Sequence, residues 1–339
     1  MRALVKNTVL FCIVLLLCFL LLEVGLRSVL PAPVVWTYPQ ESYQYDSQIG
    51  HWLESNQSAY THDKIVNTNS DGLRDHEYEK HAPINTIRIL ALGDSQTFGN
   101  GLLLEETWPK QLENALNNSG LDTKYEVLNA GLPGSDTWQH EIILERMLAR
   151  YNPDMVILAF YINDVVKKFT PSPVTKIQRD PNISKLVYFL KKSVLLLNIR
   201  IALGVVKNMI SPSSGYLLEQ ATLRGEDTPA LKERWKQVSD SIASMKRLLD
   251  ATKAEFLIFS LPRRDQVAGQ VTWDAYHSKL ATITKQNEIA LYSMLEPLQV
   301  AYKVHGKQLF IPWDGHNTNI ANRVISETLK VAIVDLTDL

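Results

Sequence analysis

Four short polar motifs follow apolar runs of the chain, and together they hold the side chains that acyl transfer requires. They are Gly93-Asp94-Ser95, the loop 129–134 with Gly134, Asn163-Asp164 and Asp314-Gly315-His316. A serine can attack an acyl carbon, a histidine can take the serine proton, and N–H groups can stabilise the resulting oxyanion. Each motif alone is common, but their joint placement after four apolar runs predicts an acyl-transfer site.

Apolar runs alternate with amphipathic helical patterns from residue 87 onward. The runs cover 87–93, 125–131, 155–161, 255–262 and 308–312. Helical patterns cover 106–118, 137–151, 231–253 and 273–287, and a last helix extends to Ile333. Nearly all-apolar strands joined by helices indicate a parallel sheet that is buried on both faces. We therefore predict a three-layer α/β/α domain with a mainly parallel five-stranded sheet, whose strand ends carry the four motifs.

With these motifs in place, residues 87–335 resemble the SGNH, or GDSL-type, hydrolase family. On that resemblance LALGDSQTFGNG holds the nucleophile Ser95, NAGLPGSDT holds Gly134, YIND holds Asn163 and DGH holds the base His316. The resemblance implies an SGNH hydrolase-like fold and an acyl-serine intermediate. It also implies that the amides of Ser95 and Gly134 and the Nδ2 of Asn163 form the oxyanion hole.

Two positions depart from the usual pattern of this family. Trp313 stands three residues before His316, where most members have Asp, and Tyr161 replaces the glycine that begins the third motif. The Asp314-x-His316 spacing is similar to that of SGNH-like O-acetyltransferases of exopolysaccharide systems, which implies that Asp314 orients His316. We expect Tyr161 to narrow the pocket in favour of small acyl groups, and Trp313 to line or close it.

A membrane-targeting segment lies near the amino terminus. Residues 8–22 are apolar, with Arg2 and Lys6 before them and Glu23 and Arg27 after them. The stretch between Lys6 and Arg27 is long enough to cross a bilayer, and no small-residue cleavage site follows it. The excess of positive charge before the segment places the amino terminus in the cytoplasm. We therefore predict one uncleaved transmembrane helix within 1–27, with the catalytic domain periplasmic or extracellular.

Residues 28–86 follow this segment and have no long apolar periodicity. They are rich in proline, polar residues and aromatics, which indicates an irregular stalk or cap that packs on the domain at 87–339. The string from Asn69 to Asp75 behind an anchor resembles membrane-tethered members of the superfamily found around bacterial envelope polysaccharide metabolism. A helical insertion is predicted at 170–230. Its 183–210 stretch is apolar with interspersed basic residues, and could pack on the domain, cover the cleft or lie on a membrane.

Composition narrows the classes of partner and cofactor. The net charge is -1, so the chain lacks the positive field of a general nucleic-acid binder and no nucleic-acid partner is predicted. Cys12 and Cys18 are the only cysteines and both lie in the apolar segment, which excludes a disulfide framework and a cysteine-based zinc site. The remaining histidines, among them His62 and His140, lack metal-ligand spacing and are interpreted as surface or packed residues. We predict neither a metal nor a cofactor.

The leading functional hypothesis is a membrane-anchored serine esterase or O-acyltransferase. It would act through an acyl-Ser95 intermediate on O-acyl, in particular O-acetyl, groups of a cell-envelope glycan or on a small ester substrate, in contact with envelope polysaccharide machinery. Hydrolysis and transfer share the acyl-enzyme and differ in whether water or a sugar hydroxyl accepts the acyl group. The alternatives are a lipid-directed esterase, such as a lysophospholipase or thioesterase, and a non-catalytic glycan-binding or assembly protein.

Overall fold

The computed structural model describes residues 2–34, 42–120, 122–166, 187 and 190–337. The chain divides into two compact units. Unit 1 joins Met1–Val35 to Asp180–Pro212, and unit 2 joins Trp36–Arg179 to Ser213–Leu339. The predicted domain division at 28–86 and 87–339 stays a prediction.

Unit 2 is built on a five-stranded sheet in the order β6-β5-β7-β8-β9. Every neighbouring pair of these strands is parallel, so the predicted three-layer α/β/α class with a parallel sheet is confirmed. The strands are β5 (Thr86–Gly93), β6 (Lys124–Gly131), β7 (Met155–Phe160), β8 (Glu255–Ser260) and β9 (Ala290–Ser293). All their carboxyl ends therefore meet at one edge of the sheet, where the polar motifs lie.

The fifth strand is not the one that the sequence analysis assigned. The run 308–312 was predicted as a strand, but it forms the end of a 3-10 helix, Gly306–Leu309, followed by a single antiparallel bridge between Phe310 and Asn317. Leu309, Phe310 and Ile311 are apolar because they are buried in the core, not because they pair in the sheet. The fifth strand is instead β9, a half-buried run that lies beside β8 at the end of the sheet.

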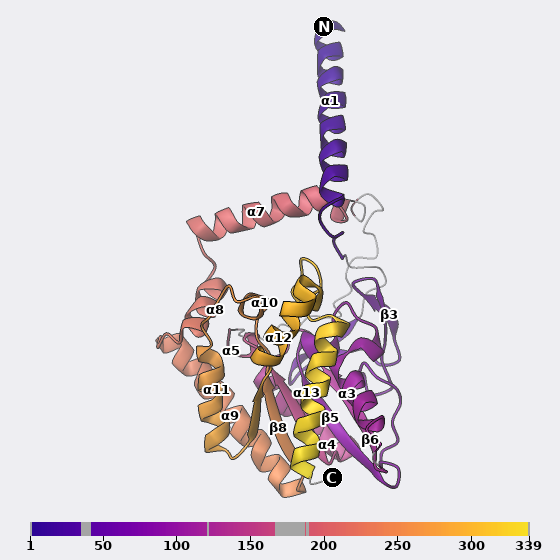
Figure 1. Cartoon of the computed structure of the whole chain (residues 1–339), viewed down its shortest axis with the longest axis vertical. Coiled ribbons are helices and arrows are strands. Elements are labelled where there is room, and N and C mark those ends of the chain that lie inside the picture. Colours follow the sequence, from indigo (N-terminus) through magenta and orange to yellow (C-terminus); the bar gives the residue numbers. More distant parts are fainter. Residues whose placement is uncertain (1, 35–41, 121, 167–186, 188–189, 338–339) are drawn as a thin grey trace. The chain divides into compact units, whose positions relative to one another are not determined.

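Helices cover both faces of the sheet (Figure 1). One face packs against α3 (Trp108–Asn117), α12 (Leu295–His305) and α13 (Asn319–Thr337), and the other against α4 (Thr137–Tyr151), α8 (Ser214–Arg224), α9 (Pro229–Thr252) and α11 (Ala275–Gln286). The central strand β5 serves both faces, because side chains alternate along a strand. Leu90 and Leu92 lie in one apolar cluster, while Ile89 and Ala91 lie in the other. The helices predicted at 106–118, 137–151, 231–253 and 273–287 correspond to α3, α4, α9 and α11.

The segment predicted as irregular contains two β-hairpins. They pair β1 (Tyr43–Asp46) with β2 (Gly50–Leu53), and β3 (Ser58–Thr61) with β4 (Lys64–Asn67). Their buried side chains, including Ile49, Trp52 and Val66, belong to the same apolar cluster as one face of the sheet. These hairpins are therefore part of the core of unit 2.

Arg74 ties this cap segment to the start of the first βα unit. Its guanidinium is buried and donates hydrogen bonds to the carbonyl oxygens of Phe98 (2.8 Å), Gly99 (2.7 Å) and Leu102 (2.5 Å). A buried cation needs such acceptors, because an unpaired charge in the interior is costly. The cap segment thus fixes the backbone that follows Ser95.

Unit 1 contains α1 (Arg2–Arg27) and α7 (Val194–Ile210). Among the described residues, α1 is the one helix that by itself is long and apolar enough to cross a membrane, and its apolar span is Leu4–Arg27. Of the insertion predicted at 170–230, the first part up to residue 189 lies outside the described residues apart from residue 187. The later part, from 190 to 230, contains α7 and α8 and the start of α9.

Candidate active site

Ser95 begins a short helix, α2 (Ser95–Phe98), directly after the central strand β5. Asp94 caps this helix, because its Oδ1 accepts a hydrogen bond from the amide of Gln96 at 2.8 Å. The turn requires a glycine at position 93, where φ is 153° and a Cβ would lie 2.2 Å from Oγ1 of Thr97. The sharp turn places the Ser95 hydroxyl at the carboxyl edge of the sheet.

The structure brings Ser95, His316 and Asp314 together in that order. Nε2 of His316 lies 2.8 Å from Oγ of Ser95, and Nδ1 of His316 is hydrogen-bonded to Oδ1 of Asp314. A backbone hydrogen bond closes the loop that holds Asp314 and His316, because the amide of Ile311 donates to the carbonyl oxygen of His316 at 2.7 Å. This is the arrangement in which a carboxylate orients an imidazole that can remove the serine proton.

Asp314 is held in its charged form. Burial alone would raise the pKa of this carboxyl, but hydrogen bonds from His316 and His62 hold it well below the ordinary value of 3.8. Asp164 is different, because burial and the neighbouring charge of Asp94 raise its pKa well above 3.8. The Asp164 carboxyl accepts hydrogen bonds from Oγ1 of Thr137 (3.0 Å) and from the amide of Tyr161 (2.8 Å), not from His316. Of the acids near the site, Asp314 is the one bonded to the histidine.

The predicted oxyanion donors follow the strands on either side of β5. Gly134 lies after β6 in the left-handed region, at a φ of 84°, and is exposed. Asn163 begins α5 (Asn163–Val166) after β7, and its Nδ2 donates to Oδ2 of Asp94 at 2.5 Å. The side-chain nitrogen of Asn163 carries two hydrogens. One N–H can therefore bond Asp94, which orients the side chain, while the other can donate to a second acceptor.

A cavity of about 460 Å³ opens at this edge of the sheet. Ser95, Asn163, Asp314 and His316 line it, whereas Gly134 is not among its lining residues. The rest of the wall is mainly polar and comes from Asp94, Gln96, Glu219, Arg263, Arg264, Asp265 and Gln270, with Tyr161, Ile162, Val166 and Gly315. Four of the five predicted site residues therefore share one cavity.

The two departures from the family pattern take different places. Tyr161 lines the cavity as expected, and burial raises the pKa of its hydroxyl, so the phenol stays neutral. Trp313 was expected to line or close the pocket, but it is absent from the lining residues. Trp313 is half-buried, and its φ of 69° lies in the left-handed region of the backbone.

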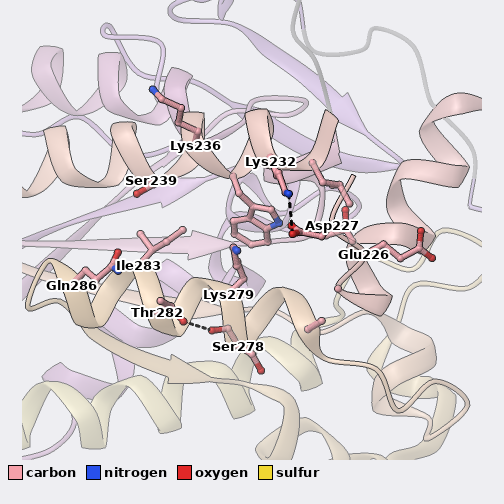
Figure 2. Close-up of a pocket in the computed structure, with 15 residues that line it drawn as sticks. Glu226, Asp227, Lys232, Lys236, Ser239, Ser278, Lys279, Thr282, Ile283 and Gln286 are labelled. Carbon is pink, nitrogen blue, oxygen red and sulfur yellow. Dashed lines mark hydrogen bonds and ion pairs between the residues drawn. The ribbon is translucent and has the colours of Figure 1, made fainter. Parts of the chain in front are cut away.

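A larger hollow of about 770 Å³ lies between α8, α9 and α11 (Figure 2). Its labelled side chains include Lys232, Lys236 and Lys279, and Lys232 pairs with Asp227 at 3.0 Å. None of its lining residues lines the cavity at Ser95, and it holds no serine–histidine pair. The larger of the two cavities is therefore not the one that holds Ser95 and His316.

Two histidines near the site were interpreted from the sequence as surface or packed residues. Nε2 of His62 lies 3.4 Å from Oδ2 of Asp314. His140 is fully buried, with Nε2 2.8 Å from Oγ of Ser135, and burial lowers its pKa to about 3. Ser135 follows Gly134, so the neutral His140 braces the loop of the second motif. No sequence signal pointed to His62, because the two short strands that its turn joins lie in a segment without apolar periodicity.

Within the described part of the chain, no group of three or more His, Cys, Asp or Glu side chains could hold a metal ion.

Comparison with known proteins agrees with this geometry. Residues 91–252 match the family model described as GDSL-like Lipase/Acylhydrolase family. A protein named Arylesterase from Vibrio mimicus is 31% identical over 117 residues, which are 34% of this chain and 55% of that protein. The chain thus spans about half the length of the curated relative that it matches.

Two solved structures show a more distant likeness. The acetyl xylan esterase AlAXEase is 14% identical, with a TM-score of 0.45, and the alignment covers 73% of this chain and 100% of that one. The psychrotrophic esterase EstA from Pseudoalteromonas sp. is 14% identical, with a TM-score of 0.42, over 74% of this chain and 99% of that one.

The match to the GDSL-like lipase/acylhydrolase family thus covers slightly less than half of the chain. The matched segment includes Ser95, Gly134 and Asn163 but ends before Asp314 and His316. The fold supplies these last two residues to the site, since His316 reaches Ser95 from 221 residues further along the chain and Asp314 is bonded to His316.

Proposed function

We propose that this protein is a serine esterase or O-acyltransferase that works through an acyl-Ser95 intermediate. The observation that carries the proposal is the 2.8 Å contact between Oγ of Ser95 and Nε2 of His316, with Asp314 on the other ring nitrogen. The name of the arylesterase relative agrees with chemistry on an ester bond.

In the first half-reaction Oγ of Ser95 attacks the ester carbonyl carbon while Nε2 of His316 takes the hydroxyl proton. Asp314 stabilises the imidazolium that forms. The amide of Ser95 and Nδ2 of Asn163, which both line the cavity, donate to the oxyanion, and the amide of Gly134 stays a predicted third donor because Gly134 is not among the lining residues. When the carbon–oxygen bond breaks, the alcohol leaves with the proton from His316, and Ser95 remains acylated.

In the second half-reaction water or a sugar hydroxyl attacks the acyl-enzyme. His316 takes the proton of this acceptor and returns it to Oγ of Ser95 as the acyl–serine bond breaks. Water gives a carboxylic acid and a sugar hydroxyl gives a new ester. Both outcomes use the same residues, so the proposed activity covers hydrolysis and transfer.

The proposed substrate is an O-acetylated glycan of the cell envelope. Tyr161 occupies the wall beside Asn163, which favours a small acyl group, and the remaining wall is rich in charged and amide side chains that suit a hydroxyl-rich alcohol. Arg263 is held there by an ion pair with Asp265 at 2.6 Å and by a second one with Glu219. A lipid-directed esterase is the second candidate, because α7 exposes apolar side chains in unit 1.

Chain-length preference tests the activity and separates these candidates. Hydrolysis of p-nitrophenyl acetate, butyrate and octanoate by the detergent-solubilised full chain should fall steeply as the acyl chain lengthens. Ser95→Ala should lose nearly all turnover, whereas Ser239→Ala in the larger hollow should keep it. A preference for octanoate would favour the lipid-directed alternative. Turnover that survives Ser95→Ala, or fluorophosphonate labelling of another serine, would overturn the catalytic assignment, and absence of turnover on every ester would favour a non-catalytic glycan-binding protein.

We further propose that α1 anchors the protein and that unit 2 lies in the periplasm or outside the cell. The apolar span Leu4–Arg27 and the excess of positive charge before it support this orientation. Protease added to intact spheroplasts should digest unit 2. Protection of unit 2, or a mature protein that starts after residue 22, would refute the topology.

A further inference from the structure

The helix α7 has a wide apolar side and a narrow basic one. On a helical projection Arg200, Gly204, Lys207 and Asn208 share one side, and aliphatic side chains fill most of the rest. The exposed aliphatic residues are Ile199, Ile201, Leu203, Val205, Val206, Met209 and Ile210. No acidic residue occurs between positions 187 and 218. This pattern is typical of helices that lie in the surface layer of an anionic bilayer.

The amino terminus of α7 is fixed to the end of α1 by Glu23. The carboxylate of Glu23 accepts hydrogen bonds from the amides of Val194 (3.0 Å) and Leu195 (2.9 Å) and from the hydroxyl of Ser193 (2.7 Å). It therefore satisfies two of the free N–H groups that begin a helix and lies at the positive end of the helix dipole. Glu23, Ser193 and Val194 are all buried in this joint.

Arg27 adds a second connection between the two helices. Its guanidinium pairs with Glu23 at 2.6 Å and donates to the carbonyl oxygen of Lys192 at 2.7 Å. The joint therefore holds the start of α7 at the level where the apolar span ends. Figure 1 shows α7 running crosswise from that end of α1.

From these observations we propose that α7 lies in the plane of the bilayer surface, on the side where α1 leaves the membrane. Its aliphatic side rests in the acyl chains, and Arg200 and Lys207 face lipid phosphates. The occupant of this apolar face is thus the lipid bilayer, in particular one that contains anionic lipid. The inference rests on the proposed membrane anchor and gives Glu23 a role, since an acidic residue at the end of a span requires a partner.

Nitroxide labels on the full chain in vesicles of phosphatidylcholine and phosphatidylglycerol test the proposal. With Cys12 and Cys18 changed to Ser, single labels are placed through Val206→Cys on the apolar side or Asn208→Cys on the basic side. Collisions with oxygen, which is enriched in acyl chains, should exceed collisions with a water-soluble nickel chelate at 206, and the order should reverse at 208. Equal nickel access at both positions, or shielding of both from both reagents, would overturn the proposal in favour of solvent exposure or packing on protein.

A label on the native Cys12, with Cys18→Ser, separates this inference from the anchor on which it rests. Oxygen access at Cys12 combined with nickel access at 206 would retain the anchor and reject the surface helix. Nickel access at Cys12 would reject both. The basic side gives an independent check, because Arg200→Gln with Lys207→Gln should make the oxygen preference at 206 insensitive to the removal of phosphatidylglycerol.

A separate observation assigns a role to His62. This residue and Asp63 form the two-residue turn between β3 and β4, with φ of 45° and 68°. Such a turn favours Asn-Gly, because two left-handed residues are strained without glycine. His62 is nevertheless buried there, with Nδ1 3.2 Å from Oγ1 of Thr61 and Nε2 3.4 Å from Oδ2 of Asp314.

We infer that His62 is a positioning residue for the proposed triad. It holds the second oxygen of Asp314, so that the first oxygen stays aimed at Nδ1 of His316. This role explains the strained turn, because the left-handed backbone at His62 and Asp63 places Nε2 of His62 beside the carboxylate of Asp314. The inference rests on the proposed function, and the role is one of orientation, since His62 is absent from the residues that line the cavity.

This role is tested by measuring kcat and KM, with kcat expressed per active site that fluorophosphonate labels. His62→Ala should lower kcat about tenfold with little change in KM, and His62→Gln, which keeps an N–H donor, should recover part of the loss. Asp63→Asn on the same turn is the matched control and should keep kcat. A merely structural role would reduce the fraction of sites that fluorophosphonate labels but leave kcat per site unchanged, and that result would reject the inference. A wild-type chain without any turnover would reject the proposed function itself.

Discussion

Asp314→Asn tests the proposed triad most directly. The substitution keeps the size of the side chain but removes the negative charge that faces Nδ1 of His316. A carboxylate and an imidazolium about 4 Å apart interact by roughly 4 kcal/mol at an effective dielectric constant of about 20. The side chains of His316 and Asp314 are 21% and 24% exposed, so solvent screens part of this interaction. We therefore expect a loss of about 2 to 4 kcal/mol in the transition state, which is roughly a 30- to 900-fold decrease in kcat.

The assay is steady-state hydrolysis of p-nitrophenyl acetate across pH. KM should change little, because the charge acts on the imidazolium that exists only as the reaction proceeds. Asp240→Asn is the control, since Asp240 is exposed and pairs with Lys236 at 2.7 Å on the surface of α9. If Asp314→Asn retained full kcat, the acid would be wrongly assigned, and a Ser95–His316 dyad would have to account for the activity.

Three further substitutions probe the site and its support. Burial lowers the pKa of His140 to about 3, so the unfolded chain binds a proton that the folded chain does not, and stability should fall by about 2 kcal/mol between pH 7 and pH 5. His140→Gln should remove this acid sensitivity in thermal or denaturant unfolding, and an unchanged pH slope would contradict the assignment. Tyr161→Gly should raise the ratio of octanoate to acetate kcat/KM about tenfold by widening the cavity, and a constant ratio would exclude Tyr161 as the restriction. Gly131→Ala should destabilise by at least about 3 kcal/mol, because its Cβ would lie 2.1 Å from the amide nitrogen of Phe98, while Gly215→Ala in open space should shift the unfolding midpoint little.

Most of the sheet could be predicted from the sequence because its central strands are buried on both faces. β5, β6, β7 and β8 read as short apolar runs, and each was predicted to within two residues at either end. The edge of the sheet could not be predicted in this way. β9 is only half-buried and therefore lacks a strong apolar signal, whereas the run at 308–312 is buried without pairing in the sheet.

The same contrast applies to the site. Residues that follow a buried strand, such as Ser95 and Asn163, could be placed at the sheet edge from the parallel topology alone. His62 could not, because its contact with Asp314 depends on the backbone of a two-residue turn in a segment without periodicity. Trp313 was expected to line or close the pocket but is absent from the lining residues, and its left-handed backbone, with a φ of 69°, could not be read from the sequence.

The contacts of Arg74 and His316 have a consequence for the order in which activity arises during synthesis. Arg74 donates to carbonyl groups that lie at most 28 residues further along the chain, so the cap segment and the turn at Ser95 can form together early. His316 must travel to Ser95 across 221 residues, after every strand of the sheet has been made. A chain that still lacks its last residues would therefore hold Ser95 without the proposed base. Under the proposed function, turnover would therefore begin only when the last loop, 310–317, has closed on the finished sheet and brought His316 to Ser95.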